Sequence, residues 1–239
     1  LEVGEPAVNP VPRKMIVQEL SALYEGGLDV TVSVPGGAEL AQKTFNPKLG
    51  IVDGISIIGT LGVVRPFSME AFVEAIRREV EVAKAIGAPR LVINSGARSE
   101  RFVKALYPNL PPQAFVHYGN YIGETISIAS ELGFKDVTMG LMIGKAVKLA
   151  TGMLDTHSRE GVMDRKFIRR MARQSGCPWR VRRAISRMTL ARELWTIIPD
   201  KHLESFCATV IRYCHSHCDA LLPSGKLTIL LISEEGKIY

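Results

Sequence analysis

Three short loops, each rich in small or polar residues, are the parts of this sequence best suited to hold a ligand. They are 94–96 (Asn-Ser-Gly), 118–124 (Tyr-Gly-Asn-Tyr-Ile-Gly-Glu) and 141–145 (Leu-Met-Ile-Gly-Lys). Each follows or ends a predicted strand, and ligands of open parallel sheets bind where strands end in loops. Backbone amides at the helix starts there favour a carboxylate or a hydroxylated sugar. One such loop is ordinary turn chemistry, whereas three on one sheet edge favour a binding site.

The stretch 4–16 (GEPAVNPVPRKMI) is a second candidate, because three prolines within seven positions make it stiff and extended. Such a segment cannot belong to a helix interior or a central strand. An acid, an amide and two cations lie on this rigid part: Glu5, Asn9, Arg13 and Lys14. A plain linker does not need this mixture, so the composition indicates a site.

Two nucleotide-binding motifs are approached but not met. The run 140–146 resembles a phosphate loop, yet it is one residue short and lacks the Ser or Thr after lysine, which argues against ATP binding. The run 94–98 is not GxGxxG, and the predicted strand 114–118 ends without the ribose-binding acid of NAD enzymes. A dehydrogenase is therefore not favoured.

Residues 155–158 (Asp-Thr-His-Ser) have the types of a hydrolase triad, but such close neighbours rarely assemble one and no nucleophile elbow is present. A helix cap at Thr156 or Ser158 is an equal alternative, and His157 stays a candidate for ligand contact or catalysis. Cys207 and the run 214–218 (CHSHC) suggest a metal, but structural zinc sites take paired ligands from two separated elements. We expect reduced core cysteines and no protein-bound metal.

The net charge of +6 is local in origin. Ten of the 30 cations lie between residues 165 and 192, where there is no acid, which leaves 20 cations against 24 anions elsewhere. Interleaved apolar residues predict amphipathic helices with a solvated cationic face. Such a face could bind nucleic acid or steer a polyanionic substrate.

In residues 65–239, predicted strands alternate with predicted helices, and this alternation implies a parallel sheet. Strands are predicted at 90–94, 114–118, 136–141 and 227–232. Helices are predicted at 68–87, 100–106 and 122–132, after the strand 136–141 up to about residue 150, and over most of 158–217. A closing strand or hairpin extends to residue 239. Residues 1–64 form a separate domain, with a helix at 13–24, strands at 28–34 and 51–58, and a short helix or strand at 38–44. The fold class is α/β in two domains.

Composition indicates a cytoplasmic protein. Apolar residues make up 46% and charged residues 23%, with no apolar run near the ~20 residues of a membrane span. The start lacks a signal pattern. Because the chain starts with Leu-Glu-Val, we read it as the visible part of a longer one.

Four strings together closely resemble the CbiD family: 4–16 (GEPAVNPVPRKMI), 54–66 (GISIIGTLGVVRP), 120–124 (NYIGE) and 143–158 (IGKAVKLATGMLDTHS). The similarity runs in order through most of residues 3–160 and is more diffuse beyond. The resemblance implies methyl transfer from S-adenosylmethionine to C-1 of cobalt-precorrin-5B, giving cobalt-precorrin-6A in anaerobic cobalamin biosynthesis.

The resemblance also implies an incomplete ribosomal-S5-like α+β domain (1–64) followed by a Rossmann-like domain (65–239). A Thr-Thr-Gly-containing segment that usually precedes the Gly-Glu-Pro motif is absent. Met142 replaces an expected histidine and Leu61 an expected threonine, and the arginine-rich run is heavier than in the family. Positions 61 and 142 are therefore assigned no role.

On this basis we expect two sets of site residues, and no nucleophilic side chain is required because a sulfonium methyl is already electrophilic. S-adenosylmethionine would be held by Asn94, Ser95, Gly96, Asn120, Gly123, Glu124 and Gly144. The carboxylate arms of a tetrapyrrole would meet Asn9, Arg13, Lys14, Arg65, Lys145 and Lys148. The competing function is a non-catalytic polyanion- or nucleic-acid-binding protein that uses residues 165–192. Nucleic acid and membrane are not the expected partners, and the sequence leaves a homo-oligomer open.

Overall fold

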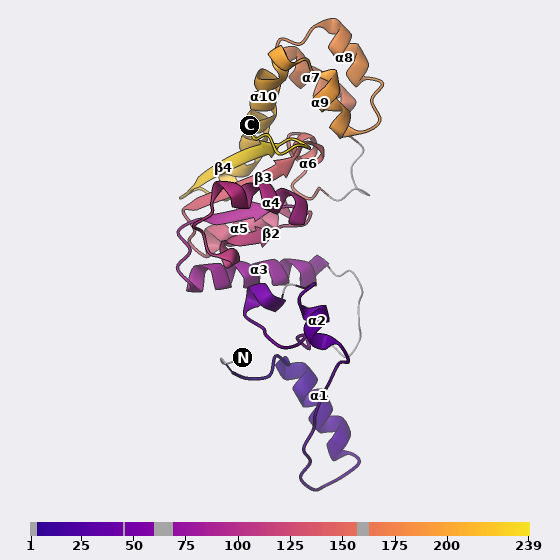
Figure 1. Ribbon diagram of the computed structural model, residues 1–239, viewed down its shortest axis with the longest axis vertical. Helices are drawn as coiled ribbons and strands as arrows, with labels where there is room; N and C mark the ends of the chain where they lie inside the picture. Colours follow the sequence, from indigo (N-terminus) through magenta and orange to yellow (C-terminus); the bar gives the residue numbers. More distant parts are fainter. Residues whose placement is uncertain (1–3, 45, 60–68, 157–162) are drawn as a thin grey trace. The chain divides into compact units, whose positions relative to one another are not determined.

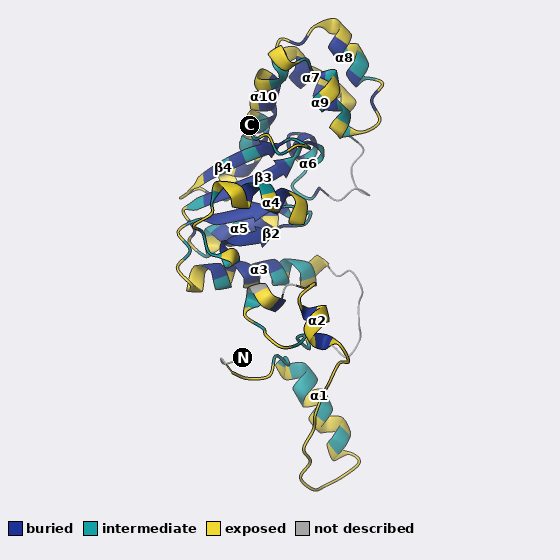
Figure 2. Cartoon of the chain, viewed as in Figure 1, coloured by how far each residue is buried: buried dark blue, intermediate teal, exposed yellow. Residues whose placement is uncertain are grey.

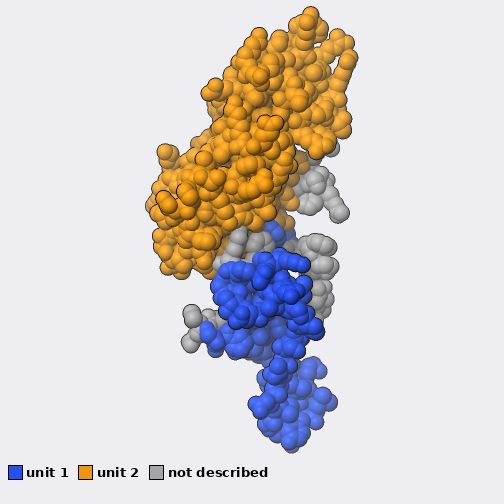
Figure 3. Space-filling view, in the orientation of Figure 1, with its two compact units in different colours: residues 1–72 blue, residues 73–239 orange. Residues whose placement is uncertain are grey.

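The structure is a computed structural model that describes residues 4–44, 46–59, 69–156 and 163–239. The chain divides into two compact units, Leu1–Phe72 and Val73–Tyr239 (Figure 3). The predicted boundary after residue 64 falls in the segment 60–68, which lies outside the described residues.

The first unit is largely irregular. It holds α1 (Pro10–Ser21), α2 (Gly37–Ala41) and the 3-10 turn η1 (Asn46–Leu49). The prediction that the stretch 4–16 is extended is wrong from residue 10, because α1 begins at Pro10, where the missing amide and fixed φ of proline suit the first helical position. Before it, Val8 and Ile57 form an isolated parallel bridge, in which Asn9 N donates to Ile57 O at 2.9 Å.

The strand predicted at 28–34 is wrong. The segment has no strand assignment, and its alternating apolar residues are 41–52% exposed: Leu28, Val30, Val32 and Val34. Alternation marks a potential strand, but a strand needs a neighbour for its amides, and none of the described residues pairs with this one. Of the predicted strand 51–58, only the bridge at Ile57 is present.

The second unit contains a four-stranded, all-parallel sheet, as predicted. Its strands are β1 (Leu91–Asn94), β2 (Phe115–His117), β3 (Asp136–Met142) and β4 (Lys226–Ile232), in the order β2-β1-β3-β4 (Figure 1). The chain leaves β1 towards β2 and then returns past β1 to β3. This reversal puts a topological switch point between β1 and β3, where such sheets bind ligands.

Helices alternate with these strands and continue beyond them: α3 (Met69–Ala85), α4 (Ala97–Leu106), η2 (Pro112–Ala114), α5 (Ile122–Glu131), α6 (Ile143–Leu149), α7 (Arg165–Gln174), α8 (Trp179–Ile185), η3 (Ala191–Glu193), α9 (Leu194–Ile197), α10 (Asp200–Cys218) and η4 (Asp219–Leu221). α4 contacts β1 and β3, whereas α6 and α10 contact β4 and one another. α7, α8 and α9 form a helical group that α10 joins to the sheet (Figure 1). No helix in the described part of the chain is long and apolar enough to span a membrane.

The sheet is the core of the second unit (Figure 2). β1 is buried along its whole length, and Val92, Val103, Phe115 and Ile232 pack on the side of α4. The four cysteines are free thiols and buried, and no group of three or more potential metal ligands occurs among the described residues.

Gly140 on β3 is a tightly packed position in this core. A Cβ there would stand 2.8 Å from Val103 Cγ1 and 3.3 Å from Ile232 Cδ1. Gly140→Ala should therefore lower the free energy of unfolding by about 1–3 kcal/mol, measured by urea titration. Gly144→Ala is the matched control, because nothing lies within 4 Å of its Cβ and alanine favours a helix by up to about 1 kcal/mol. Equal effects of the two substitutions would contradict this account.

Candidate functional site

The carboxyl ends of β1, β2 and β3 gather the polar loops that the sequence singled out. Asn94, the last residue of β1, lies opposite His117 on β2 and Gly140 on β3. Its buried side chain accepts a bond from Gly96 N at 3.2 Å and donates to Val116 O at 3.4 Å. Asn94 therefore fixes the turn from β1 to α4.

Gly96 gives this turn a shape that only glycine adopts. Its φ of 151° and ψ of −175° lie in a region closed to residues with a side chain. Nothing stands within 4 Å of the place of a Cβ, so the backbone here borders open space. Beside it, the Ser99 hydroxyl bonds to Ser95 N at 3.2 Å and Gly96 O at 3.0 Å. The loop is thus rigid and open, which suits close approach of a ligand.

Lys145 connects the start of α6, which follows β3, to the loop after β2. From the first turn of α6, its ammonium donates to Gly119 O and, at 3.0 Å, to Asn120 Oδ1. It also lies 5.2 Å from the ring centroid of Tyr118, whose hydroxyl donates to Gly140 O at 3.2 Å. Burial, and secondarily the nearby Lys148 ammonium, lowers the pKa of Lys145 to about 8, against an opposing effect of Asp155.

The segment 153–156 folds back over the loop after β2. Thr156 N donates to Asn120 O at 3.0 Å, and Ile122 N donates to Leu154 O at 3.1 Å. Lys148 donates to Thr156 O at 3.3 Å from the side of α6. These bonds assemble the predicted residues Asn120, Lys145 and Lys148 into one network.

Three further predicted residues lie at helix starts. Gly123 is buried, and a Cβ on it would stand 3.0 Å from Leu154 Cβ, so close packing explains this glycine. Glu124 is exposed in the first turn of α5, and Gly144 lies half-buried in the first turn of α6. Glu124 and Gly144 thus remain open to a ligand at the same edge.

Sequence reasoning missed a pair formed by His117 and Glu100. His117 Nε2, at the end of β2, bonds to Glu100 Oε2 from α4, and the other carboxylate oxygen lies 2.5 Å from Lys104 Nζ. No acidic residue ends the predicted strand 114–118 in the sequence, but in the structure Glu100 of α4 places a carboxylate at this end. The available signal was the position of Glu100 in the first turn of the helix that follows β1.

The other predicted residues are not brought into this edge by any described contact. Arg65 and His157 lie outside the described residues. In the first unit, Arg13 donates to Val8 O and Pro6 O, both at 3.0 Å, so its guanidinium braces the Pro-rich segment. Asn9 is half-buried, and Lys14 is exposed.

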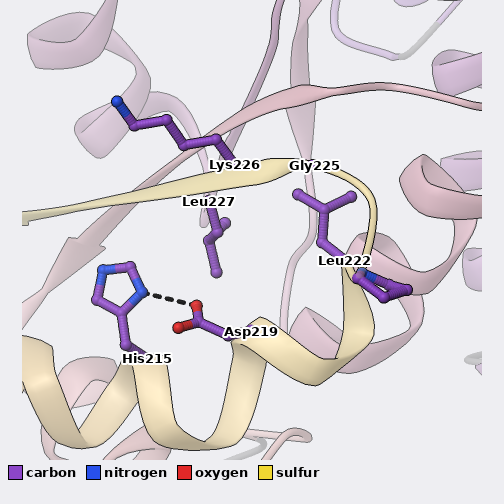
Figure 4. Close-up of a pocket in the computed structure, with 7 residues that line it drawn as sticks. His215, Asp219, Leu222, Gly225, Lys226 and Leu227 are labelled. Carbon is purple, nitrogen blue, oxygen red and sulfur yellow. Dashed lines mark hydrogen bonds and ion pairs between the residues drawn. The ribbon is translucent and has the colours of Figure 1, made fainter.

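A pocket at the opposite, amino edge of the sheet has a different character. It is lined by residues of α10, η4 and the start of β4, where His215 Nδ1 and Asp219 Oδ1 lie 2.7 Å apart (Figure 4). Lys226 points away from this pair (Figure 4). The pocket contains none of the predicted site residues.

Comparison with known proteins places the chain in a family. The CbiD family model matches residues 1–66, and the model of the CbiD C-terminal domain matches residues 155–239. Similar curated proteins are named cobalt-precorrin-5B C(1)-methyltransferase. They come from Prosthecochloris aestuarii (42% identity over 98% of this chain), Geobacillus thermodenitrificans (39% over 95%) and Thermus thermophilus (36% over 98%). The chain spans 65%, 62% and 65% of these relatives, and no solved structure matches it.

The lowered pKa of Lys145 predicts a pH-dependent stability. Between pH 8 and its ordinary value of 10.5, the unfolded chain holds this proton and the folded chain does not, so stability rises with pH. The unfolding free energy of the wild type, relative to Lys145→Met, should be flat below about pH 8 and increase towards pH 10.5. Urea titrations from pH 7 to 10.5 measure this difference. Lys135→Met, at an exposed lysine, controls for loss of one cation, and a difference that does not change with pH would refute the assignment.

Proposed function

Because the chain belongs to the CbiD family, we propose that it is an S-adenosylmethionine-dependent C-methyltransferase. It methylates cobalt-precorrin-5B at C-1 to give cobalt-precorrin-6A in anaerobic cobalamin biosynthesis. The observation that carries this proposal is the 36–42% identity, over nearly the whole chain, to proteins that bear this name. The names of these relatives describe a methyltransferase, so they give no support to the alternative of nucleic-acid binding. Cobalt enters as part of the substrate, and the enzyme acts in the cytoplasm.

The finer fold assignment belongs to this proposal. The second unit is Rossmann-like, which is supported by the parallel order β2-β1-β3-β4 and its switch point. The first unit is part of an α+β domain of ribosomal-S5 type, as the family resemblance implies.

The carboxyl edge of the sheet suits S-adenosylmethionine. The adenosyl group needs backbone that it can approach closely and polar groups for its hydroxyls, and Gly96 and Gly144 both border open space. Contacts from the turn after β1, from the loop after β2 with the start of α5, and from the first turn of α6 hold it: Asn94, Ser95, Gly96, Asn120, Gly123, Glu124 and Gly144. Asn94 and Gly123 act by shaping the backbone, since both are buried. Glu124 is exposed and takes a ribose hydroxyl or the amino group.

The bound cofactor supplies an electrophilic methyl on sulfur. The chain's task is then to align the donor with the electron-rich ring carbon and to exclude water, which needs no side-chain nucleophile. Lys145 and Lys148 serve this task by fixing the loops on either side of β1. The carboxylate arms of the tetrapyrrole are assigned to these two lysines and to Asn9, Arg13, Lys14 and Arg65. Of these, Lys14 is exposed, whereas Arg13 is engaged by backbone carbonyls.

The proposed activity is tested by methyl transfer itself. The protein is incubated with methyl-labelled S-adenosylmethionine and cobalt-precorrin-5B, and the macrocycle is isolated. We expect one labelled methyl per ring, located at C-1 by NMR, and S-adenosylhomocysteine in equal amount. Unlabelled macrocycle, from protein that binds both compounds, would refute the function.

The role of Glu124 is tested against a second glutamate of the same helix. Glu124→Gln should weaken S-adenosylmethionine binding by about tenfold in calorimetry, because one charge-assisted hydrogen bond is lost. Glu131→Gln is the matched control, since Glu131 lies at the other end of α5 and pairs with Arg77 at 2.7 Å. Unchanged affinity of the Glu124 variant would remove that residue from the site.

A further inference from the structure

Residues 164–193, here called the cationic lobe, concentrate positive charge on α7, α8 and their connections. Only two acids, Asp164 and Glu193, accompany ten cations: Arg165, Lys166, Arg169, Arg170, Arg173, Arg180, Arg182, Arg183, Arg187 and Arg192. All of the cations except Arg182 are exposed. The apolar faces of α7 and α8 are buried, so the helices present their charges outward.

Both acids of the cationic lobe are used for backbone bonds. Asp164 caps α7 by accepting a bond from Phe167 N at 2.9 Å. Glu193 accepts bonds from Leu190 N at 2.6 Å and Thr189 N at 2.9 Å, and these two bonds are the main cause of its lowered pKa. Among the described residues, no carboxylate lies within ion-pair distance of any cation of the lobe.

This arrangement opposes the stability of α7. Arg165, Arg169 and Arg173 follow one another at i, i+4 spacing on one helix face, where like charges repel. Arg165 and Lys166 also lie in the first turn, where the helix dipole disfavours cations. A merely solvated face would tolerate mixed charges, so the all-positive face suits a multivalent anion that relieves the repulsion.

The lobe is connected to the candidate site. η3, which ends the lobe, packs against α6, and α10 packs against both α6 and α7. α6 begins directly at the carboxyl end of β3 and carries Lys145 and Lys148. The end of the lobe therefore adjoins the helix that borders the site.

We propose that the cationic lobe captures the tetrapyrrole substrate through its carboxylate arms before the ring enters the site. This inference rests on the proposed function, which supplies a substrate with several acetate and propionate arms. Nine of the ten cations are arginines, and the planar guanidinium binds carboxylates in bidentate fashion and is weakly hydrated. A cluster of like charge also raises the encounter rate of an anion, by an amount that falls with salt.

Uroporphyrin, a tetrapyrrole with eight carboxylates, is the probe that tests capture without turnover. Its binding to the whole chain is followed by fluorescence at 50 and 300 mM NaCl. The lobe variant carries four exposed changes: Arg169→Gln, Arg173→Gln, Arg183→Gln and Arg187→Gln. The control variant removes four exposed cations elsewhere in the second unit: Arg78→Gln, Arg101→Gln, Lys135→Gln and Lys226→Gln. The two variants have equal net charge, so only the position of the charge differs.

We expect the lobe variant to bind uroporphyrin at least about tenfold more weakly at 50 mM NaCl and to lose most of the salt dependence. The control variant should bind like the wild type. Coproporphyrin, with four carboxylates, should bind the wild type more weakly than uroporphyrin. Equal weakening in both variants would overturn the proposal, as would tighter binding of a single-stranded RNA that the lobe changes abolish.

Turnover separates this inference from the proposed function. With cobalt-precorrin-5B, the lobe variant should show a raised KM for the tetrapyrrole, while kcat and the KM for S-adenosylmethionine stay unchanged. Methyl transfer with an unchanged tetrapyrrole KM in the lobe variant would overturn capture and leave the methyltransferase standing. No methyl transfer by the wild type, with uroporphyrin binding as expected, would remove the enzyme assignment alone.

Discussion

The ammonium of Lys145 is the interaction on which the ligand-binding edge depends. It reaches from α6 past the end of β1 to the loop after β2, where it meets Gly119 O and Asn120 Oδ1. Hydrogen bonds from a charged donor contribute roughly 1.5–3 kcal/mol each, enough to hold two loops that no strand pairing connects. Asn120 in turn accepts the amide of Thr156, so a third segment is held by the same network.

Sequence alone predicted the elements whose signals are local. β3 was expected at 136–141 and extends over Asp136–Met142, because an apolar run between Gly133 and the α6 helix suits a buried strand. The segment 28–34 has an equally clear pattern but no partner among the described residues, and pairing is a property of the fold. The Glu100–His117 contact depends on the register of β1 with β2 for the same reason, so the position of Glu100 in the first turn of α4 is a signal for an acid but not for its partner.

The two sets of positive charge in the second unit differ in their surroundings. Burial lowers the pKa of Lys145, and each of its hydrogen bonds goes to a defined oxygen, so Lys145 fixes the geometry of the loops that it contacts. The cations of the cationic lobe other than Arg182 are exposed and have no carboxylate partner among the described residues, so their effect is an electrostatic field that extends about one Debye length, ~8–10 Å at physiological salt. The first set organises a site, and the second acts on what approaches it.

The backbone conformation of Gly96 decides how a natural substitution at this position should be interpreted. Nothing lies within 4 Å of the place of its side chain, so a score based on contacts or clashes would accept alanine there. The torsions, φ 151° and ψ −175°, forbid it. A variant at this position would thus pass a steric filter and still reshape the turn that follows β1, which makes the backbone angle, and not the crowding, the informative quantity.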